Sequence, residues 1–497
     1  MTYVVVPKEV KLKYILGNHS SFSPHALKGI FILNKNTKTL GEIIGENFSK
    51  GKPVSRSAFV KNSGKFLITN SALQNDFLLS RKRESAFISL VPSAFSNPTL
   101  IKDSILLALN GNVGQSSYVD IDDVENYTIS PWMINFHLEK NNKYLFAFLK
   151  SQFFLEQVEF LTPKGAILSN ANEKLLNAQI AFPPSKDSEK IIKYVEVLVQ
   201  SIIDKEKEIQ IKNALIFNLI NREISENQTK NEFKYNQPKI SQLVEFNRIN
   251  GAFYSKYFKE REFKLLNYSR GVTGIKDLGF KITRGQNLQV SCIGKSIYSD
   301  KKIDGFYTLV IPKNISTYGT VLKYEYLGSS KKLKTLKAGD IIFGAEGFEK
   351  GRSVVVFEDR NNTITNIHGM TINHSGQNIV LSVFIKCFLD YLRQIELIDL
   401  YAVGGNGGSL AQKYWDVIPF PNFPEKKQKE IVELYYNPTP REDTKTLDEY
   451  TSYDREWNQE AGIVQIDESL KKTKGRLESV INMIVSDKDI EMDFSNI

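Results

Sequence analysis

A regular spacing of apolar residues marks one long helix near the middle of the chain, over residues 187–226. Its apolar side chains recur at alternating steps of four and three residues, and neither Pro nor Gly interrupts them. This spacing keeps one seam of a helix against a partner helix. The predicted seam is Ile191, Val195, Leu198, Ile202, Ile209, Ile216 and Leu219, with Lys205 and Lys212 at two further positions. Taken alone, an amphipathic helix on a globular core is the simpler interpretation.

The same spacing returns near the C-terminus. The second predicted seam is Ile466, Leu470, Leu477, Val480 and Ile484. A similar turn begins at Ile431, but residues 437–461 are rich in Pro, Thr, Asp and Tyr, which predicts an insertion that interrupts the second helix. Two helices of matching pattern can pair antiparallel and form a spacer between two globular parts.

Short motifs occur twice in the same order and at nearly the same spacing. Leu40-Gly41 matches Leu278-Gly279, residues 104–111 match 340–347, and residues 180–183 (Ile-Ala-Phe-Pro) match 418–421 (Ile-Pro-Phe-Pro). This repetition predicts one unit used twice, roughly over residues 1–230 and 231–497.

Strand-like runs precede short helical patterns in each half, so the predicted fold class is α+β. We expect two similar β-rich domains separated by a pair of long antiparallel helices. The predicted parts are residues 1–183 (first domain), 184–230 (first spacer helix), 231–423 (second domain) and 424–497 (second spacer helix with the insertion).

The charge balance makes a polyanion a plausible partner, since the net charge is +9 and the pI is about 9.0. The two cysteines, Cys292 and Cys387, are too few for a disulfide framework and fit a reducing compartment. The sequence shows no membrane-spanning run and no signal peptide, so we expect a cytoplasmic protein.

Several stretches together resemble the specificity (S) subunits of type I restriction-modification enzymes. In the second half these are residues 340–344 with Gly347 and Gly351, the loop 404–410, residues 418–421 and the helix start at Lys427. In the first half they are residues 106–111, 180–183 and 189–192. The resemblance covers most of the chain, from about Leu40 to Ile484.

The resemblance implies two domains that each recognise one half of a split DNA target, and helices that set the gap between the halves. It also implies no catalytic centre and no cofactor in this chain. Two methyltransferase subunits, with S-adenosylmethionine in the partner, are expected to bind, and restriction-translocase subunits can join them. A related methyltransferase-nuclease system without a motor, or a tandem scaffold independent of DNA, is the alternative.

Recognition of DNA requires cations at phosphates and polar groups at base edges. The candidates in the first half are Lys50, Lys52, Arg56, Asn70, Gln74, Arg81, Lys82 and Arg83. The candidates in the second half are Lys281, Arg284, Gln286, Lys331, Lys332, Lys334, Lys350 and Arg352. For any single residue, a solvent-exposed charge is the simpler interpretation. Phe217, Ile220 and Ile224 are candidates for a partner surface, with core packing as the alternative.

Enzymatic interpretations find little support in the sequence. Gly45 to Lys52 lacks the spacing of a phosphate-binding loop, and residues 437–440 (Asn-Pro-Thr-Pro) lack the aromatic residue of an adenine methyltransferase tetrad. The five histidines have no metal-ligand spacing. Asp340 and Glu346 could be imagined as paired nuclease acids, which leaves a nuclease as a further hypothesis. Ser104 and Asn110 stand at the matching places, however, which indicates a structural role.

Overall fold

The computed structural model describes residues 3–5, 9–13, 29–95, 100–162, 172–184, 186–347, 350–358, 362–404, 408–442 and 446–494. The chain divides into two compact units. Unit 1 comprises residues 1–208, 440–459 and 468–497, and unit 2 comprises residues 209–439 and 460–467. Helix α5 (Ser188–Glu226) contributes its first half to unit 1 and its second half to unit 2. Part of the glycine-rich loop 404–410 lies outside the described residues.

Unit 1 contains a four-stranded antiparallel sheet and a three-stranded sheet. The first has the order β4 (Phe48–Lys50), β10 (Met133–Phe136), β7 (Ile105–Ala108), β8 (Ser116–Tyr118). The second has the order β6 (Phe87–Ser89), β5 (Phe66–Ile68), β9 (Tyr127–Ile129), with β9 parallel to β5. Short pairs join β3 (Thr37–Thr39) to β11 (Gln179–Ala181) and β1 (Val4–Val5) to β2 (Gly29–Ile30).

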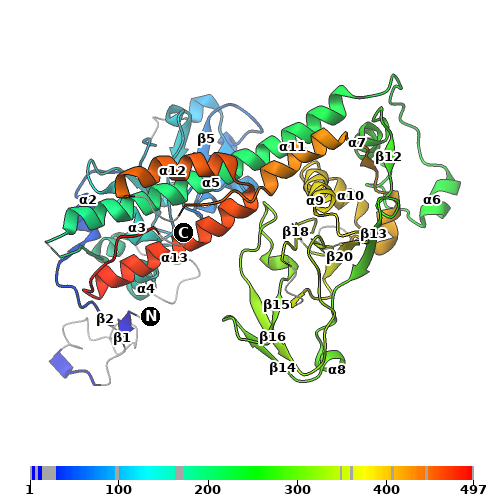
Figure 1. Ribbon diagram of the computed structural model, residues 1–497. Coiled ribbons are helices and arrows are strands. Elements are labelled where there is room, and N and C mark those ends of the chain that lie inside the picture. Colours follow the sequence, from blue (N-terminus) through cyan, green and yellow to red (C-terminus); the bar gives the residue numbers. More distant parts are fainter. Residues whose placement is uncertain are drawn as a thin grey trace. The chain divides into compact units, whose positions relative to one another are not determined.

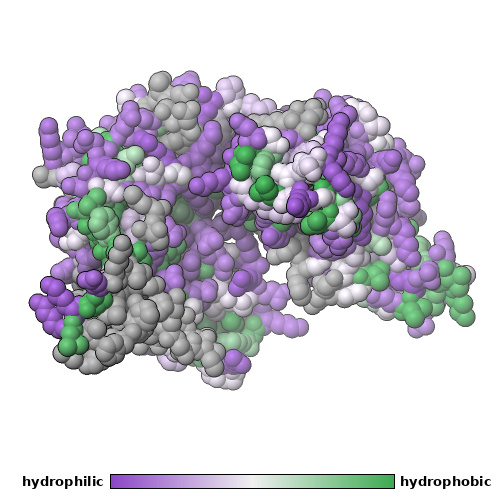
Figure 2. Space-filling view, turned by 90° about the horizontal axis from the view of Figure 1, so that it is seen from below, coloured by the Kyte–Doolittle hydropathy of each residue, from purple (hydrophilic) through white to green (hydrophobic). Residues whose placement is uncertain are grey.

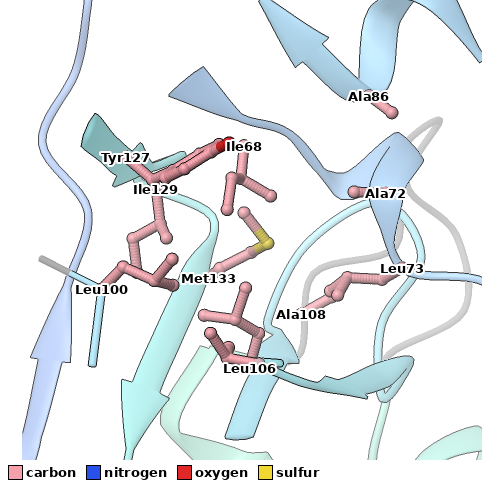
Figure 3. Close-up of a cluster of buried hydrophobic side chains, with 11 residues drawn as sticks. Ile68, Ala72, Leu73, Ala86, Leu100, Leu106, Ala108, Tyr127, Ile129 and Met133 are labelled. Atoms are coloured by element: carbon pink, nitrogen blue, oxygen red, sulfur yellow. The ribbon is translucent and has the colours of Figure 1, made fainter. Parts of the chain in front are cut away.

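The core of unit 1 lies where these two sheets meet. Figure 3 shows Ile68 and Ile129 of the three-stranded sheet pointing toward Leu106 and Met133 of the four-stranded sheet. All four side chains are fully buried, and burial of an aliphatic side chain contributes about 1.5–3 kcal/mol. Because the strands are short, each sheet alone buries few side chains. The shared apolar cluster therefore holds the two sheets together.

The helices of unit 1 flank these sheets. They are α2 (Leu40–Ile44), α3 (Asn142–Lys150), α4 (Gln152–Leu161), the first half of α5, α12 (Leu447–Glu460) and most of α13 (Ile463–Val485). Thr39 and Glu42 form a capping box at the start of α2, which satisfies two backbone amides.

Unit 2 repeats this strand order and adds one edge strand, β14, to its second sheet. Its antiparallel sheet has the order β13 (Phe280–Arg284), β20 (Gly369–His374), β17 (Ile341–Gly344), β18 (Ser353–Val355). Its second sheet has the order β14 (Ser296–Ser299), β16 (Glu325–Ser329), β15 (Tyr307–Leu309), β19 (Thr363–Ile364), with β19 parallel to β15. β12 (Val272–Thr273) pairs with β21 (Phe420–Pro421) as β3 pairs with β11.

The helices of unit 2 are shown in green to orange in Figure 1. They are α6 (Ile240–Phe246), α7 (Lys256–Leu266), α8 (Val290–Ile293), α9 (Ile379–Gln394), α10 (Leu397–Tyr401), α11 (Glu425–Tyr435) and the second half of α5. Exposed apolar side chains gather on α6 and just after it, at Ile240, Val244 and Ile249, and Figure 2 shows this apolar end of unit 2.

One glycine occupies the same tight position in both units. A Cβ atom on Gly51 would lie 2.1 Å from the carbonyl oxygen of Ile129, and one on Gly285 would lie 2.2 Å from that of Asn366. Gly51 directly follows edge strand β4, and Gly285 directly follows edge strand β13. At both places one backbone segment passes close against another. The shared strand order and this shared contact confirm the predicted α+β class and the internal repeat.

The first predicted seam is buried along most of α5. Ile191, Val195, Leu198 and Ile202 are buried in unit 1, and Ile209 and Ile216 are buried in unit 2. Leu219 is only half-buried, because the apolar residues after Ile216 step by four and bury Ile220 and Ile224 instead.

The candidate partner surface on α5 is therefore wrong. Ile220 and Ile224 are buried, and the ring of Phe217 lies 5.3 Å from that of Tyr391 on α9, between ring centroids. These side chains belong to the packing of unit 2.

The second predicted seam is buried as well. Its members Ile466, Leu470, Leu477, Val480 and Ile484 are all buried. In unit 1, α13 runs beside the first half of α5 in the opposite direction (Figure 1). Polar contacts join these two helices, since Arg476 Nε donates to Tyr194 Oη at 3.0 Å and Lys474 Nζ lies 2.6 Å from Glu206 Oε1.

The predicted interruption is present, but it contains a further helix. α11 ends at Tyr435, α13 begins at Ile463, and α12 lies between them. Pro438 and Pro440 precede α12, so the helix-breaking residues lie in the connection before this helix and not within it. Among the described residues, no helix is both long and apolar enough to span a membrane.

A buried charge network holds α12 to α5. Lys205 Nζ lies 2.5 Å from Asp454 Oδ1, and Arg441 Nη2 lies 2.7 Å from the same oxygen. Ser201 Oγ donates to Asp454 Oδ2 at 2.8 Å. Burial lowers the pKa of Lys205 to about 8, although Asp454 opposes this change. Burial also acts to raise the pKa of Asp454, but the two cations lower it.

We predict that Asp454→Ala loosens α12 by about 3–5 kcal/mol, because it removes the partner that the buried Lys205 shares with Arg441. Asp448→Ala is the matched control, since Asp448 pairs with Lys193 between the same two helices at an exposed site and should cost less than about 1 kcal/mol. Amide hydrogen exchange of the α12 segment measures both changes. Equal exchange rates in the two variants would contradict the role of the buried pair.

Candidate nucleic-acid interface

The segment between β5 and β6 of unit 1 carries most of the first set of candidates. The Asn70 side chain donates to the carbonyl of Asn110, and Gln74 Nε2 donates to the carbonyl of Ser71 at 2.8 Å. Both residues are half-buried, so their amides help to shape the loop. The structure brings Asn70 next to the turn after β7, which sequence spacing did not indicate.

The basic cluster that follows is exposed. The Arg81 guanidinium lies 4.2 Å from the centre of the Phe87 ring, and its Nη2 donates to Tyr127 Oη at 3.0 Å. Lys82 Nζ lies 2.6 Å from Asp76 Oδ2. Arg83 precedes a short 3₁₀ turn and is also exposed. The aromatic contact orients Arg81 while its charge stays near solvent.

Two charged residues from outside the loop hold its backbone. Lys150, at the end of α3, donates to the carbonyls of Gln74, Asp76 and Ser116 at 3.0, 2.9 and 3.1 Å. Glu206 of α5 accepts from the amides of Phe77 and Leu78 at 2.8 and 3.0 Å. Burial lowers the pKa of Lys150 to about 8. Neither residue could be predicted from the sequence, because both contact backbone groups that are far away along the chain.

The remaining candidates of unit 1 lie at the edge of its four-stranded sheet. Lys50 ends β4, Lys52 follows Gly51, and Arg56 begins a 3₁₀ turn that Ser55 caps. All three basic side chains are exposed.

Lys50 has a counterpart in unit 2. Lys50 pairs with Ile134 of β10, and Arg284 pairs with Met370 of β20, at the same register position of the two sheets. Glu346 contacts two side chains with its carboxylate. Arg284 Nη1 lies 2.5 Å from Glu346 Oε1, and His368 Nδ1 lies 2.8 Å from Glu346 Oε2. Burial acts to raise the pKa of Glu346, but hydrogen bonds from His368 and Arg284 lower it.

Most other candidates of unit 2 lie around the end of β13. Lys334 Nζ donates to Thr283 Oγ1 at 3.1 Å, and its backbone amide donates to Gln286 Oε1 at 3.3 Å. Lys331 Nζ donates to the carbonyl of Cys292 at 3.1 Å. Lys281, Lys331, Lys332 and Lys334 are all exposed. The structure therefore brings together two stretches that are some fifty residues apart in the sequence.

Two candidates of unit 2 face the interior. Lys350 is buried and its Nζ lies 2.6 Å from Asp399 Oδ1, so its assignment to DNA contact is wrong. Arg352 is half-buried and donates to the carbonyl of Ile315 at 3.0 Å. Gly351 lies between these two residues in a tightly packed turn, where an added Cβ atom would lie 3.0 Å from the Arg393 side chain and 3.2 Å from that of Ile398.

Asp340 and Glu346, the two acids considered for a nuclease, are engaged in contacts that stabilise the fold. Asp340 is buried and its Oδ2 accepts from the amide of Lys337 at 2.8 Å, which closes a turn. Glu346 is held by Arg284 and His368, as described above. In the described part of the chain, no group of three or more His, Cys, Asp or Glu side chains could hold a metal ion.

The family of the first half follows from a direct match. Residues 32–215 match the family model of the type I restriction modification DNA specificity domain. This part of the chain is a specificity domain. It runs from just before β3 into α5 and contains all eight candidates of the first half, so the resemblance seen in the sequence is confirmed there.

Solved structures of similar proteins span nearly the whole chain. An S subunit of a type I restriction-modification system from M. genitalium is 14% identical, with a TM-score of 0.45, and the match covers 93% of this chain and 99% of that one. The HsdS subunit from Thermoanaerobacter tengcongensis is 11% identical, with a TM-score of 0.26, over 90% and 96% of the two chains. No curated protein matches this chain.

A third match comes from a study of complex assembly and conformational transition of the type I restriction-modification system. It is 13% identical, with a TM-score of 0.30, over 92% of this chain and 99% of that one.

We predict that Lys150 makes the stability of unit 1 depend on pH. Its pKa in the folded chain is about 8, below the roughly 10.4 of an unfolded lysine. Between these values the unfolded chain binds more protons, so the unfolding free energy rises with pH, by at most about 1.4 kcal/mol per pH unit from this group. Lys150→Met should show a shallower rise from pH 8 to 10 in urea titrations. An unchanged slope would contradict the assignment.

Proposed function

We propose that this chain is the non-catalytic DNA specificity subunit of a type I restriction-modification system. In this function, each unit recognises one half of a split DNA target. The observation that carries the proposal is the recurrence of the specificity-domain strand order in unit 2, with β14 as an additional edge strand, although the family match ends at residue 215. Two copies of one DNA-reading fold on one chain fit a target in two parts.

Differences at matching positions favour an asymmetric target. Lys50 ends the edge strand in unit 1, where Arg284 ends it in unit 2. Asn110 follows β7 where Glu346 follows β17, and Trp132 precedes β10 where His368 precedes β20. Because hydrogen-bond donors and acceptors select different bases, unlike side chains at one place in the fold recognise unlike half-sites.

The proposed partners supply the chemistry. Two methyltransferase subunits that bind S-adenosylmethionine would modify adenine at the target, and restriction-translocase subunits would cleave DNA. This chain would bind neither cofactor nor metal and would act in the cytoplasm. The exposed basic residues at β4 and β13 would neutralise phosphates, while polar groups of the adjoining loops would contact base edges.

Selection from random-sequence duplexes tests the proposal directly. We expect the purified chain, together with its methyltransferase subunit, to enrich two short conserved blocks separated by a gap of fixed length. Enrichment of a single block, or of none, would contradict the proposed function. Cleavage of DNA by the chain alone with a divalent metal would favour a nuclease instead.

We predict that Lys281→Ala weakens DNA binding similarly for all sequences. Lys281 is exposed on β13 between the buried Phe280 and Ile282, so its removal leaves the sheet intact. Loss of one phosphate contact should reduce the slope of log affinity against log salt by about 1. Lys426→Ala is the control, since Lys426 is an exposed lysine on α11 outside the candidate set. The same slope in wild type and Lys281→Ala would exclude this contact.

A further inference from the structure

We propose that Glu206 and Lys150 are positioning residues for the recognition of one half-site. They clamp the backbone of residues 74–78 and so fix the DNA-contact side chains of the loop that continues to Arg83. This inference rests on the proposed function and assigns to it two residues that need not touch DNA.

Glu206 supplies the acidic side of the clamp. Its Oε2 accepts from two consecutive amides, those of Phe77 and Leu78, and its Oε1 lies 2.6 Å from Lys474 Nζ of α13. Glu206 is buried, so this carboxylate depends on these three partners in place of water. A shift of the loop would leave buried amides and a buried charge unsatisfied.

Lys150 supplies the basic side of the clamp. Its ammonium group has three protons to donate, and it donates to three carbonyls, two of which belong to the same loop. The third, that of Ser116, belongs to β8 of the four-stranded sheet. The loop is therefore tied to the sheet through Lys150 and to the helix pair through Glu206.

The clamped residues are adjacent to the candidate DNA contacts. The carbonyl of Gln74 is held by Lys150, and the side chain of Asp76 pairs with Lys82. Lys82 lies between Arg81 and Arg83 in the exposed basic cluster. Movement of the clamped backbone would displace these groups together, and readout of a base tolerates little displacement because its hydrogen bonds are directional.

Unit 2 contains a related device. A 3₁₀ turn follows β15 at Pro312–Asn314, as one follows β5 at Asn70–Ala72. Beyond it, the carbonyl of Tyr318 accepts from Lys386 Nζ at 3.2 Å, and the carbonyl of Gly319 accepts from Tyr435 Oη at 2.6 Å. Lys386 lies on α9, as Lys150 lies on α3. In each unit, a lysine of this helix therefore donates hydrogen bonds to the backbone of the matching loop. Tyr435 of α11 supplies the second contact, where unit 1 uses Glu206 of α5.

The test is random-sequence selection with the methyltransferase-bound complex, for wild type, Glu206→Ala and Glu206→Gln. Lys207→Ala is the matched control, because Lys207 is the next residue of α5 and its pair with Asp120 is half exposed. In Glu206→Ala we expect discrimination at one half-site to fall about tenfold, which is the effect of losing one good base contact. Discrimination at the other half-site should be unchanged. Glu206→Gln should restore part of the loss, since its amide oxygen still accepts both N–H groups although its amide nitrogen cannot accept from Lys474.

Amide hydrogen exchange of the segment that contains Phe77 and Leu78 gives a second readout, which does not require DNA. It should rise at least about tenfold in Glu206→Ala and little in Lys207→Ala. Lys150→Met should impair the same half-site, which covers the case that Glu206→Ala does not fold.

Three results would overturn the clamp. These are equal selection profiles for Glu206→Ala and Lys207→Ala, equal losses at both half-sites, or unchanged exchange of the segment. Failure of the proposed function looks different, because wild type itself would then show no two-part preference while the exchange result could still hold.

Discussion

The structure depends on how α5 buries charged residues along with its apolar seam. Lys205 and Glu206 are consecutive on this helix and both are buried. A buried charge is stable only when it is paired and hydrogen-bonded, and each of these two finds a different element. Lys205 meets Asp454 of α12, and Glu206 meets Lys474 of α13 and the amides of the 74–78 loop. These charged pairs thus specify which segment packs against α5 at Lys205 and at Glu206. Apolar contacts alone are less selective and would allow other segments to pack there.

The repeat shows how one fold carries two different surfaces. The strand order, the parallel pair in the second sheet and the glycine at the sheet edge are shared, because they fix the path of the backbone. The side chains at Lys50 and Arg284, or at Trp132 and His368, differ because they end on the surface and leave the core unaffected. This separation allows the surface side chains of each unit to vary without loss of its fold.

The sequence was informative where the signal was periodic or repeated. Helix α5, the second seam and the duplicated order followed from spacing alone, and the specificity domain was recognisable from short motifs. The sequence misplaced residues whose environment depends on tertiary contacts. Lys350 is hydrophilic by type but is buried against Asp399, and Ile220 and Ile224 cover unit 2 instead of a partner.

Other features had no signal in the sequence. α12 lies in a segment whose prolines predicted irregular structure, and its attachment depends on a pair, Lys205 and Asp454, whose members are far apart in the chain. Lys150 and Glu206 bind backbone groups, which are the same whatever the residue type. A single sequence cannot reveal such contacts by pattern, because any residue could supply the backbone partner.

Hydroxyl-radical footprinting on a selected target duplex tests the central claim most directly, that two copies of one unit recognise two parts of one site. The chain bound to its methyltransferase subunit should protect two separate patches of the backbone, with cleavage retained between them. One continuous patch, or protection at a single half-site, would contradict the account.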